Sequence, residues 1–189
     1  MNATLPSYLK HHFLIAMPHM VDPNFAQALI YLVEHNRDGA MGLIVNRPSG
    51  LNLADILEQL RPDEPISAAS QHLPIFSGGP VQTDRGFVLH PADTDFQATL
   101  GLGELGVTTS QDVLFAIADG YGPSRHFIAL GYAGWEPGQL EAELVDNAWL
   151  SCPAQPHILF DLPHKQRLTA AAASLGVDLR LLSSQVGHA

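Results

Sequence analysis

The sequence predicts an α+β domain whose sheet begins with antiparallel strands. Strand-like and helix-like segments intermix along the chain without the strict alternation that a doubly wound parallel fold requires. The second and third apolar runs are joined by the short polar stretch 34–39, in which Gly39 can adopt positive φ, so they predict an antiparallel hairpin. These two observations favour α+β over a parallel α/β architecture.

The first half of the chain predicts five strands and one helix. The strands are short apolar runs bounded by turn formers, and they lie at 13–17, 28–33, 41–45, 73–77 and 86–90. The helix follows the third strand, where apolar residues recur at helical spacing in Leu53, Ile56, Leu57 and Leu60. Asn52 is placed to cap its first turn and Pro62 blocks its extension, so the stretch 61–72 is expected to be a loop.

The next predicted helix covers 113–118. Thr109 and Asp112 match a capping box ahead of it, and Gly120 suits the left-handed residue that ends a helix. A strand is predicted immediately afterwards at 127–133, where glycines indicate close approach of another backbone segment.

The last quarter predicts two helices and two short strands. One helix begins at Pro137, whose missing N–H costs nothing in a first turn, and packs Leu140 and Leu144 inward. Strands are expected at 149–150 and 157–160, followed by a final helix at 163–175.

Length and composition indicate one globular domain covering residues 1–189. At 189 residues, with 46% apolar and 15% charged side chains, the chain has the makeup of a folded single-core protein. Cys152 is the only cysteine, so no internal disulfide is expected. The N-terminal apolar run 13–17 is too short for a signal peptide or a membrane helix, which favours a cytoplasmic location without membrane attachment.

The charge balance disfavours nucleic acid as a direct partner. Nineteen acidic residues against nine Lys and Arg give a formal net charge of −10, which opposes the approach of a polyanion. The basic residues are scattered along the sequence, although folding could still gather some of them.

Many multi-residue blocks, in one order along nearly the whole chain, resemble the AlgH/YqgE family of bacterial proteins. They lie at 13–18, 22–25, 34–36, 39–43, 46–48, 78–81, 86–90, 109–114, 130–135, 138–141, 147–150 and 187–189. The resemblance implies a bifurcated, largely antiparallel sheet folded into a pseudo-barrel and flanked by helices. It implies no reaction, because the family has none established, but it does imply a regulatory role, since one member is named as a candidate transcriptional regulator of alginate production.

Two motifs that suggest cofactors have simpler interpretations. Gly101–Gly106 spells GxGxxG, but residues 96–100 are a poor strand, no helix opens within the motif, and Glu104 puts a carboxylate in the supposed phosphate cradle, so a loop is expected. The ten histidines show no HExxH spacing, and Cys152 with His157 lacks the second ligand pair of a structural zinc site. We therefore expect no metal and no cofactor.

Eight residues are candidates for a ligand-binding site near strand ends, with no catalytic set among them. They are Asn46, Arg47, Ser77, Gly78, Gly79, Arg85, His90 and Trp135. Backbone N–H groups of the Ser77–Pro80 segment could hold an anion, and Arg47 or Arg85 could clamp a carboxylate or phosphate. The structural alternatives are a tight turn at Gly78–Gly79, a loop fixed by Asn46 and Arg47, and a core position for Trp135.

These observations leave two main hypotheses for function. The first is a non-enzymatic regulatory or interaction protein with a protein partner. The second is an enzyme or binding protein for a small anionic metabolite at Gly78–Gly79 with Arg47 or Arg85. Direct recognition of DNA ranks last because of the net charge. The oligomeric state does not follow from the sequence.

Overall fold

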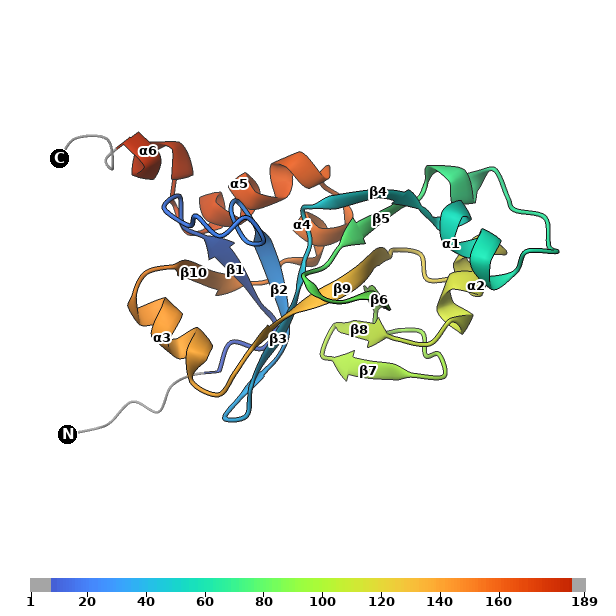
Figure 1. Cartoon of the computed structure of the whole chain (residues 1–189), viewed down its shortest axis with the longest axis horizontal. Coiled ribbons are helices and arrows are strands. Elements are labelled where there is room, and N and C mark those ends of the chain that lie inside the picture. Colours follow the sequence, from blue (N-terminus) through green and yellow to red (C-terminus); the bar gives the residue numbers. More distant parts are fainter. Residues whose placement is uncertain (1–7, 185–189) are drawn as a thin grey trace.

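The computed structural model describes residues 8–184, and within that range ten strands form one sheet system with helices around it (Figure 1). The strands are β1 His12–Ala16, β2 Leu29–Asn36, β3 Gly39–Ile44, β4 Pro48–Asn52, β5 Pro74–Ser77, β6 Val81–Pro91, β7 Thr99–Leu102, β8 Leu105–Thr108, β9 Phe127–Trp135 and β10 Trp149–Pro153. The helices are α1 Leu53–Leu60, α2 Asp112–Ala118, α3 Gln139–Val145, α4 Pro156–Phe160, α5 His164–Ser174 and α6 Leu179–Ser184, with a 3₁₀ turn at Ala69–His72.

The sheet is antiparallel except at one pairing, and it curls into a half-barrel. Its main path runs β10-β1-β2-β3-β9-β6-β8-β7, while β4 pairs with β5 away from that path. Only the pairing of β5 with β9 is parallel among the strands of the described range. The α+β prediction is therefore confirmed, as is the early hairpin, in which Asn36 pairs with Gly39.

The sheet divides at β9, the strand that both branches share. The first part of β9 pairs with β5 on one side and β6 on the other, whereas its last three residues, from Ala133 to Trp135, pair with β3. Gly78 lies in the angle between the branches, because its N–H donates to the Leu130 carbonyl and its carbonyl accepts from the Ile44 N–H, both at 2.8 Å. This is the bifurcation that the family resemblance implies.

Three apolar clusters fill the spaces that the divided sheet creates. The largest lies under α4 and α5 and contains Phe13, Tyr31 and Phe87. A second lies under α3 on the opposite face and contains Trp135 and Trp149. The third lies at the far end of the molecule in Figure 1, where α1 and α2 cover Ile75, Val88 and Ile128. Each cluster is thus covered by one helix or by a pair of helices.

The end of the first helix and its cap are as predicted. The Asn52 side chain accepts from the Asp55 N–H, and the Asp55 carboxylate accepts from the Asn52 N–H, which forms a reciprocal capping box. The predicted capping box at Thr109 is wrong. Gln111 occupies the position before α2 and makes no side-chain cap, while the Asp112 carboxylate accepts instead from the N–H groups of Gln97 and Val113.

Several other elements differ from the predictions. Residues 157–160 are not a strand, because Pro156 begins the short helix α4 there. Strands β4, β7 and β8 and helix α6 were not predicted, and β6 begins at Val81 rather than at Gly86, with an irregular register between the two. Helix α3 begins at Gln139, two residues after Pro137. The block at 187–189, including His188, lies outside the described residues.

Across residues 8–184, we find no helix with the length and apolar character needed to cross a membrane.

Candidate functional site

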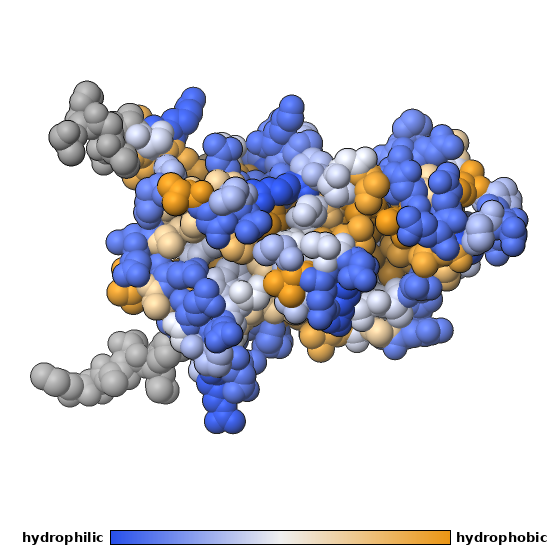
Figure 2. Space-filling model, in the orientation of Figure 1, coloured by the Kyte–Doolittle hydropathy of each residue, from blue (hydrophilic) through white to orange (hydrophobic). Residues whose placement is uncertain are grey.

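A groove lies between the α1 end of the molecule and the strands β6, β8 and β9. Its volume is about 380 Å³, within the range of sites that hold small molecules or inserted side chains. Its walls are formed by Leu51, Ile56, Gln59, Leu60, Ile75, Asp84, Gly86, Phe87, Val88, Thr108, Thr109, Ser110, Gln111, Leu114, Ile128 and Leu130. We call it the α1–α2 groove. Figure 2 shows apolar surface in this region, between the α1–α2 end and the middle of the sheet.

Helix α1 forms one wall of the groove because the apolar stripe on this helix is broad. Leu53 and Leu57 point into the third cluster and are buried, with 0% and 2% of their surface exposed. Ile56 and Leu60 lie beside them on the same stripe and are only partly buried. The helix therefore anchors itself with one row of side chains and lines the groove with the next.

The β6 wall comes from strand alternation. Side chains along a strand point alternately to opposite faces, so Asp84, Gly86 and Val88 face the groove. Gly86 leaves space there, because a Cβ at that position would meet only the Leu130 Cδ2, at 3.9 Å. The groove is thus widened by a residue without a side chain.

Arg85 lies on the opposite face of β6 and does not contribute to this groove. Its guanidinium lies over the Phe87 ring at 5.2 Å and borders a separate hollow next to β7. That hollow has a volume of about 360 Å³ and is also lined by Leu100 and Val107. Arg47 lines another pocket altogether, so the two candidate anion clamps do not converge.

Asn46 and Arg47 fix the loop before β2 through backbone hydrogen bonds. The Asn46 side chain accepts from the Leu29 N–H at 2.9 Å and donates to the Gln27 carbonyl at 2.9 Å. The Arg47 guanidinium donates to the carbonyls of Asn24 and Ala26. Asn46 and Arg47 therefore fix a loop, which is the structural alternative given for them above. Three of the five guanidinium N–H groups of Arg47 remain for other contacts.

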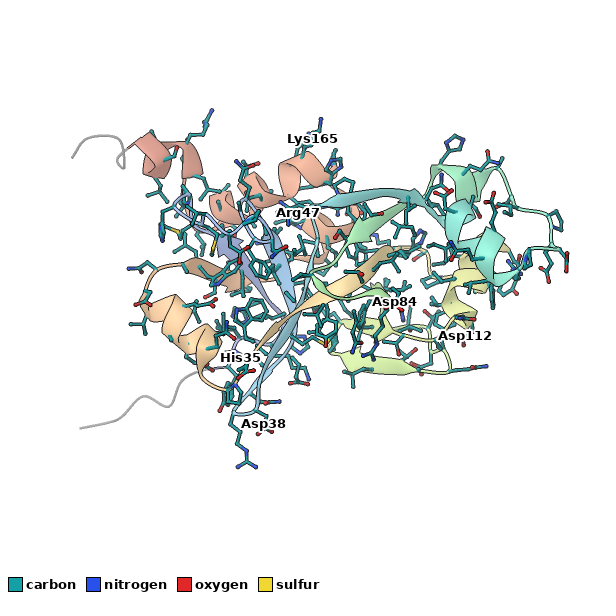
Figure 3. The ribbon with its side chains drawn as sticks, viewed as in Figure 1. His35, Asp38, Arg47, Asp84, Asp112 and Lys165 are labelled. Carbon is teal, nitrogen blue, oxygen red and sulfur yellow. The ribbon has the colours of Figure 1, made fainter. Side chains whose placement is uncertain are left out.

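Arg47 also borders a pocket of about 400 Å³ together with the start of α5. The other lining residues are Ala26, Gln27, Asn46, His164, Lys165, Leu168 and Thr169. His164 and Lys165 are the first residues of α5, whose N-terminus has no side-chain cap. Figure 3 shows Arg47 and Lys165 on the same side of the molecule, so this is a place where positive charge gathers. His164 and Lys165 were not among the residues that we predicted.

Ser77, Gly78 and Gly79 form the inner angle of the divided sheet. The Ser77 N–H donates to the Arg47 carbonyl at 2.8 Å, and the Gly78 N–H to Leu130, so neither is free to hold an anion. A Cβ on Gly79 would lie 2.1 Å from the Tyr132 carbonyl carbon, and one on Gly78 would lie 2.3 Å from the Gly131 oxygen. Glycine is required here by close backbone packing.

His90 is fully buried and belongs to an ordered chain of hydrogen bonds. Its Nδ1 donates to the Pro91 carbonyl at 2.8 Å, since a carbonyl oxygen can only accept. Its Nε2 shares a hydrogen bond with the Thr108 hydroxyl at 2.7 Å, and the Thr108 and Thr99 hydroxyls share another at 2.7 Å. Both ring nitrogens are occupied, so His90 joins β6, β8 and β7.

Trp135 lies in the second apolar cluster at 6% exposure and does not line the groove. Its ring packs against Phe25 and Trp149, with ring centroids 6.3 and 6.0 Å away. The indole N–H groups of both tryptophans donate to one Glu143 oxygen, at 2.9 and 2.8 Å. Trp135 therefore occupies a core position, which is the structural alternative given for it above.

The GxGxxG segment forms the β7–β8 hairpin, with Gly103 at φ 76° in its turn. No helix follows within the motif, so the geometry of a dinucleotide cradle is missing, although the segment is paired strands rather than the expected loop. Among residues 8–184, no three His, Cys, Asp or Glu side chains come together as a metal site would require.

Comparison with known proteins identifies close relatives along the full length of the chain. A family model described as AlgH-like matches residues 13–180. A UPF0301 protein of Stutzerimonas stutzeri is 81% identical, and the UPF0301 protein AlgH of Pseudomonas aeruginosa is 69% identical, each over 100% of both chains.

Two solved structures share the fold. The solution structure of AlgH from Pseudomonas aeruginosa superposes with a TM-score of 0.82 at 69% identity over 100% of both chains. A crystal structure of a Corynebacterium diphtheriae protein has a TM-score of 0.74 at 20% identity, covering 97% of this chain and 94% of that one, and supports the fold alone.

Proposed function

The chain belongs to the AlgH-like family, and we propose that it is a non-enzymatic interaction protein of the cytoplasm that acts by binding a protein partner in the α1–α2 groove. The observation that carries this proposal is the apolar wall of the groove. Ile56, Leu60, Leu114 and Leu130 remain only partly buried there, and Leu51 at the rim is 42% exposed. Apolar surface left open beside a core is typical of an interaction site.

A regulatory role fits this proposal when it is exerted through the partner. The family resemblance implies an effect on transcription in alginate production, and the net charge of −10 disfavours direct contact with DNA. The protein would then act on transcription by changing the activity of its protein partner.

Partner capture with groove variants tests the proposal. Gly86→Ile fills the groove at a site where the new Cβ meets no backbone atom, and Gly101→Ile makes the same change on β7, where a Cβ meets nothing within 4 Å. We expect the wild type and Gly101→Ile to capture the same proteins from their own cytosol, and Gly86→Ile to lose them. Capture that is absent, or equal for all three proteins, contradicts the proposal.

The second candidate is a binding site for a small anionic metabolite, favoured by the meeting of Arg47, His164 and Lys165 at one pocket. An anion there would also face the uncapped first turn of α5. Arg47 is distant in sequence from His164 and Lys165, so it is the fold that brings these groups together. The chain has only nine Lys and Arg, and two of them lie at this pocket.

Thermal shift with inorganic phosphate, citrate and a nucleoside diphosphate tests this candidate. A ligand at 100 times its dissociation constant stabilises the fold by about 2.7 kcal/mol. Lys165→Gln should reduce the shift, while Arg37→Gln, which removes the same charge from the exposed tip of the β2–β3 hairpin, should leave it unchanged. The candidate fails when no anion stabilises the protein, or when both variants respond like the wild type.

A further inference from the structure

The α1–α2 groove carries negative charge on its walls and no positive charge. Asp84 is the one ionisable side chain in the lining, and within residues 8–184 its carboxylate makes no hydrogen bond or ion pair. A ligand that enters the groove therefore meets an available carboxylate beside apolar walls.

The helices and strands around the groove add further negative charge and no paired positive charge of their own. Helix α1 contributes Asp55 and Glu58, and α2 contributes Asp112, whereas β4, α1, β8 and α2 contain no Lys or Arg. Burial would raise the pKa of Asp112, but hydrogen bonds from the Ser110 hydroxyl and the Gln97 N–H lower it, so this carboxylate stays charged at neutral pH.

The two nearest cations in sequence do not neutralise these groups. Arg85 points to the other face of β6, over the Phe87 ring. Arg61, just after α1, is paired with Glu64 at 2.9 Å and with Asp119 at 3.3 Å. Figure 3 shows Asp84 and Asp112 on the α1–α2 side of the molecule, well away from Arg47 and Lys165.

The exposed rim favours a partner that covers a surface. Leu51, Gln59, Thr109 and Gln111 are exposed around the opening, whereas a small ligand is normally enclosed over most of its own surface. A protein segment can place apolar side chains into such a groove and cover its rim at the same time.

We propose that the occupant of the α1–α2 groove is a cationic amphipathic protein segment, whose apolar side chains contact Ile56, Leu60 and Leu114 while a lysine or arginine meets Asp84. This inference rests on the proposed interaction function and adds the chemistry of the partner. Charge complementarity of this kind selects the partner more than it raises affinity.

Three synthetic amphipathic peptides of equal length, combining leucine with lysine, glutamate or glutamine, test the charge of the occupant. Titrations of methyl-labelled protein followed by NMR locate the binding site, and calorimetry at low ionic strength measures affinity. We expect the lysine peptide to shift the methyl resonances of Ile56, Leu60 and Leu114, and to bind about tenfold more tightly than the glutamate peptide.

Matched variants distinguish the effect of a charge in the groove from the effect of the protein's net charge. Asp84→Asn should lower the affinity for the lysine peptide by about two- to fivefold, which is the range expected for the loss of an exposed ion pair. Asp38→Asn removes the same charge at the tip of the β2–β3 hairpin, far from the groove in Figure 3, and should have no comparable effect. Gly86→Ile should abolish the methyl shifts, and Gly101→Ile should preserve them.

The outcomes separate the two proposals. Equal binding of the glutamate or glutamine peptide, equal effects of the two aspartate variants, or methyl shifts outside the groove would overturn the cationic partner and leave the interaction function standing. When no peptide of any charge shifts the groove methyls, and Gly86→Ile still captures the wild-type partners, the groove itself is not the binding surface.

Discussion

Arg167 shows how a single buried charge can hold a helix to this sheet. It is 7% exposed, its Nε donates to the Leu162 carbonyl at 3.1 Å, and its Nη1 donates to the Val45 carbonyl. The guanidinium lies over the rings of Phe76 and Phe127, and burial lowers its pKa to about 10. No carboxylate forms an ion pair with it within the described range, so its stabilisation comes from carbonyls and aromatic faces.

We predict that Arg167→Ala lowers the free energy of unfolding by about 2–4 kcal/mol, because it leaves the Val45 and Leu162 carbonyls without their donor. Arg125→Ala is the matched control, since it breaks the exposed pair with Asp161 and should cost less than about 1 kcal/mol. Urea denaturation measures both. Equal losses for the two variants would show that Arg167 does not hold α5 to the sheet.

Residue-level patterns predicted the local features well but not the groove. Asn52 and the spacing of Leu53, Ile56, Leu57 and Leu60 predicted both α1 and its cap, since these signals act within one turn. The groove joins residues 51–60 to Asp84, Gln111 and Leu130, and no local pattern links those positions. Lys165 was missed for the same reason, because only the fold brings it to the pocket of Arg47.

At the scale of the elements, the errors of sequence reasoning follow from short segments. Residues 157–160, of which Ile158, Leu159 and Phe160 are apolar, fit a strand or a helix equally, and the preceding Pro156 favours the helix. β7 and β8 have four residues each, one of them a glycine, so their formation depends on the pairing of β8 with β6 rather than on their own strand propensity. The long runs of β1, β2 and β9 were predicted because burial on both faces makes them continuously apolar.

The angle between the two branches of the sheet depends on glycine. We predict that Gly79→Ala destabilises the protein by about 3 kcal/mol, because the new Cβ would lie 2.1 Å from the Tyr132 backbone at a positive φ of 154°. Gly101→Ala, on a strand with open space around it, should change stability by less than about 0.5 kcal/mol. Thermal denaturation compares the two. A tolerated Gly79→Ala would mean that the branches can separate without loss of the fold.

For the whole molecule, the distribution of charge decides which partners can approach. Of the nine Lys and Arg, all within the described residues, Lys10, Arg61, Arg125 and Arg180 form ion pairs with acidic side chains, and Arg167 is buried. Arg37, Arg47, Arg85 and Lys165 remain. Arg37 lies at a hairpin tip, Arg85 beside β7, and only Arg47 and Lys165 share a pocket. These four cations do not form a continuous basic face.

We therefore predict that the protein does not bind duplex DNA directly. A DNA-binding surface that neutralises six to ten phosphates loses about 10³–10⁵ in affinity between 50 and 200 mM salt, and a single pocket with two cations in a chain of net charge −10 cannot supply such contacts. Fluorescence anisotropy with a labelled duplex, measured at about 50 mM salt where electrostatic binding is strongest, should show no complex, and Lys165→Gln should change nothing. Micromolar binding with a steep salt dependence would require a cationic surface made by association of several chains, and it would move the regulatory role from a partner protein to DNA itself.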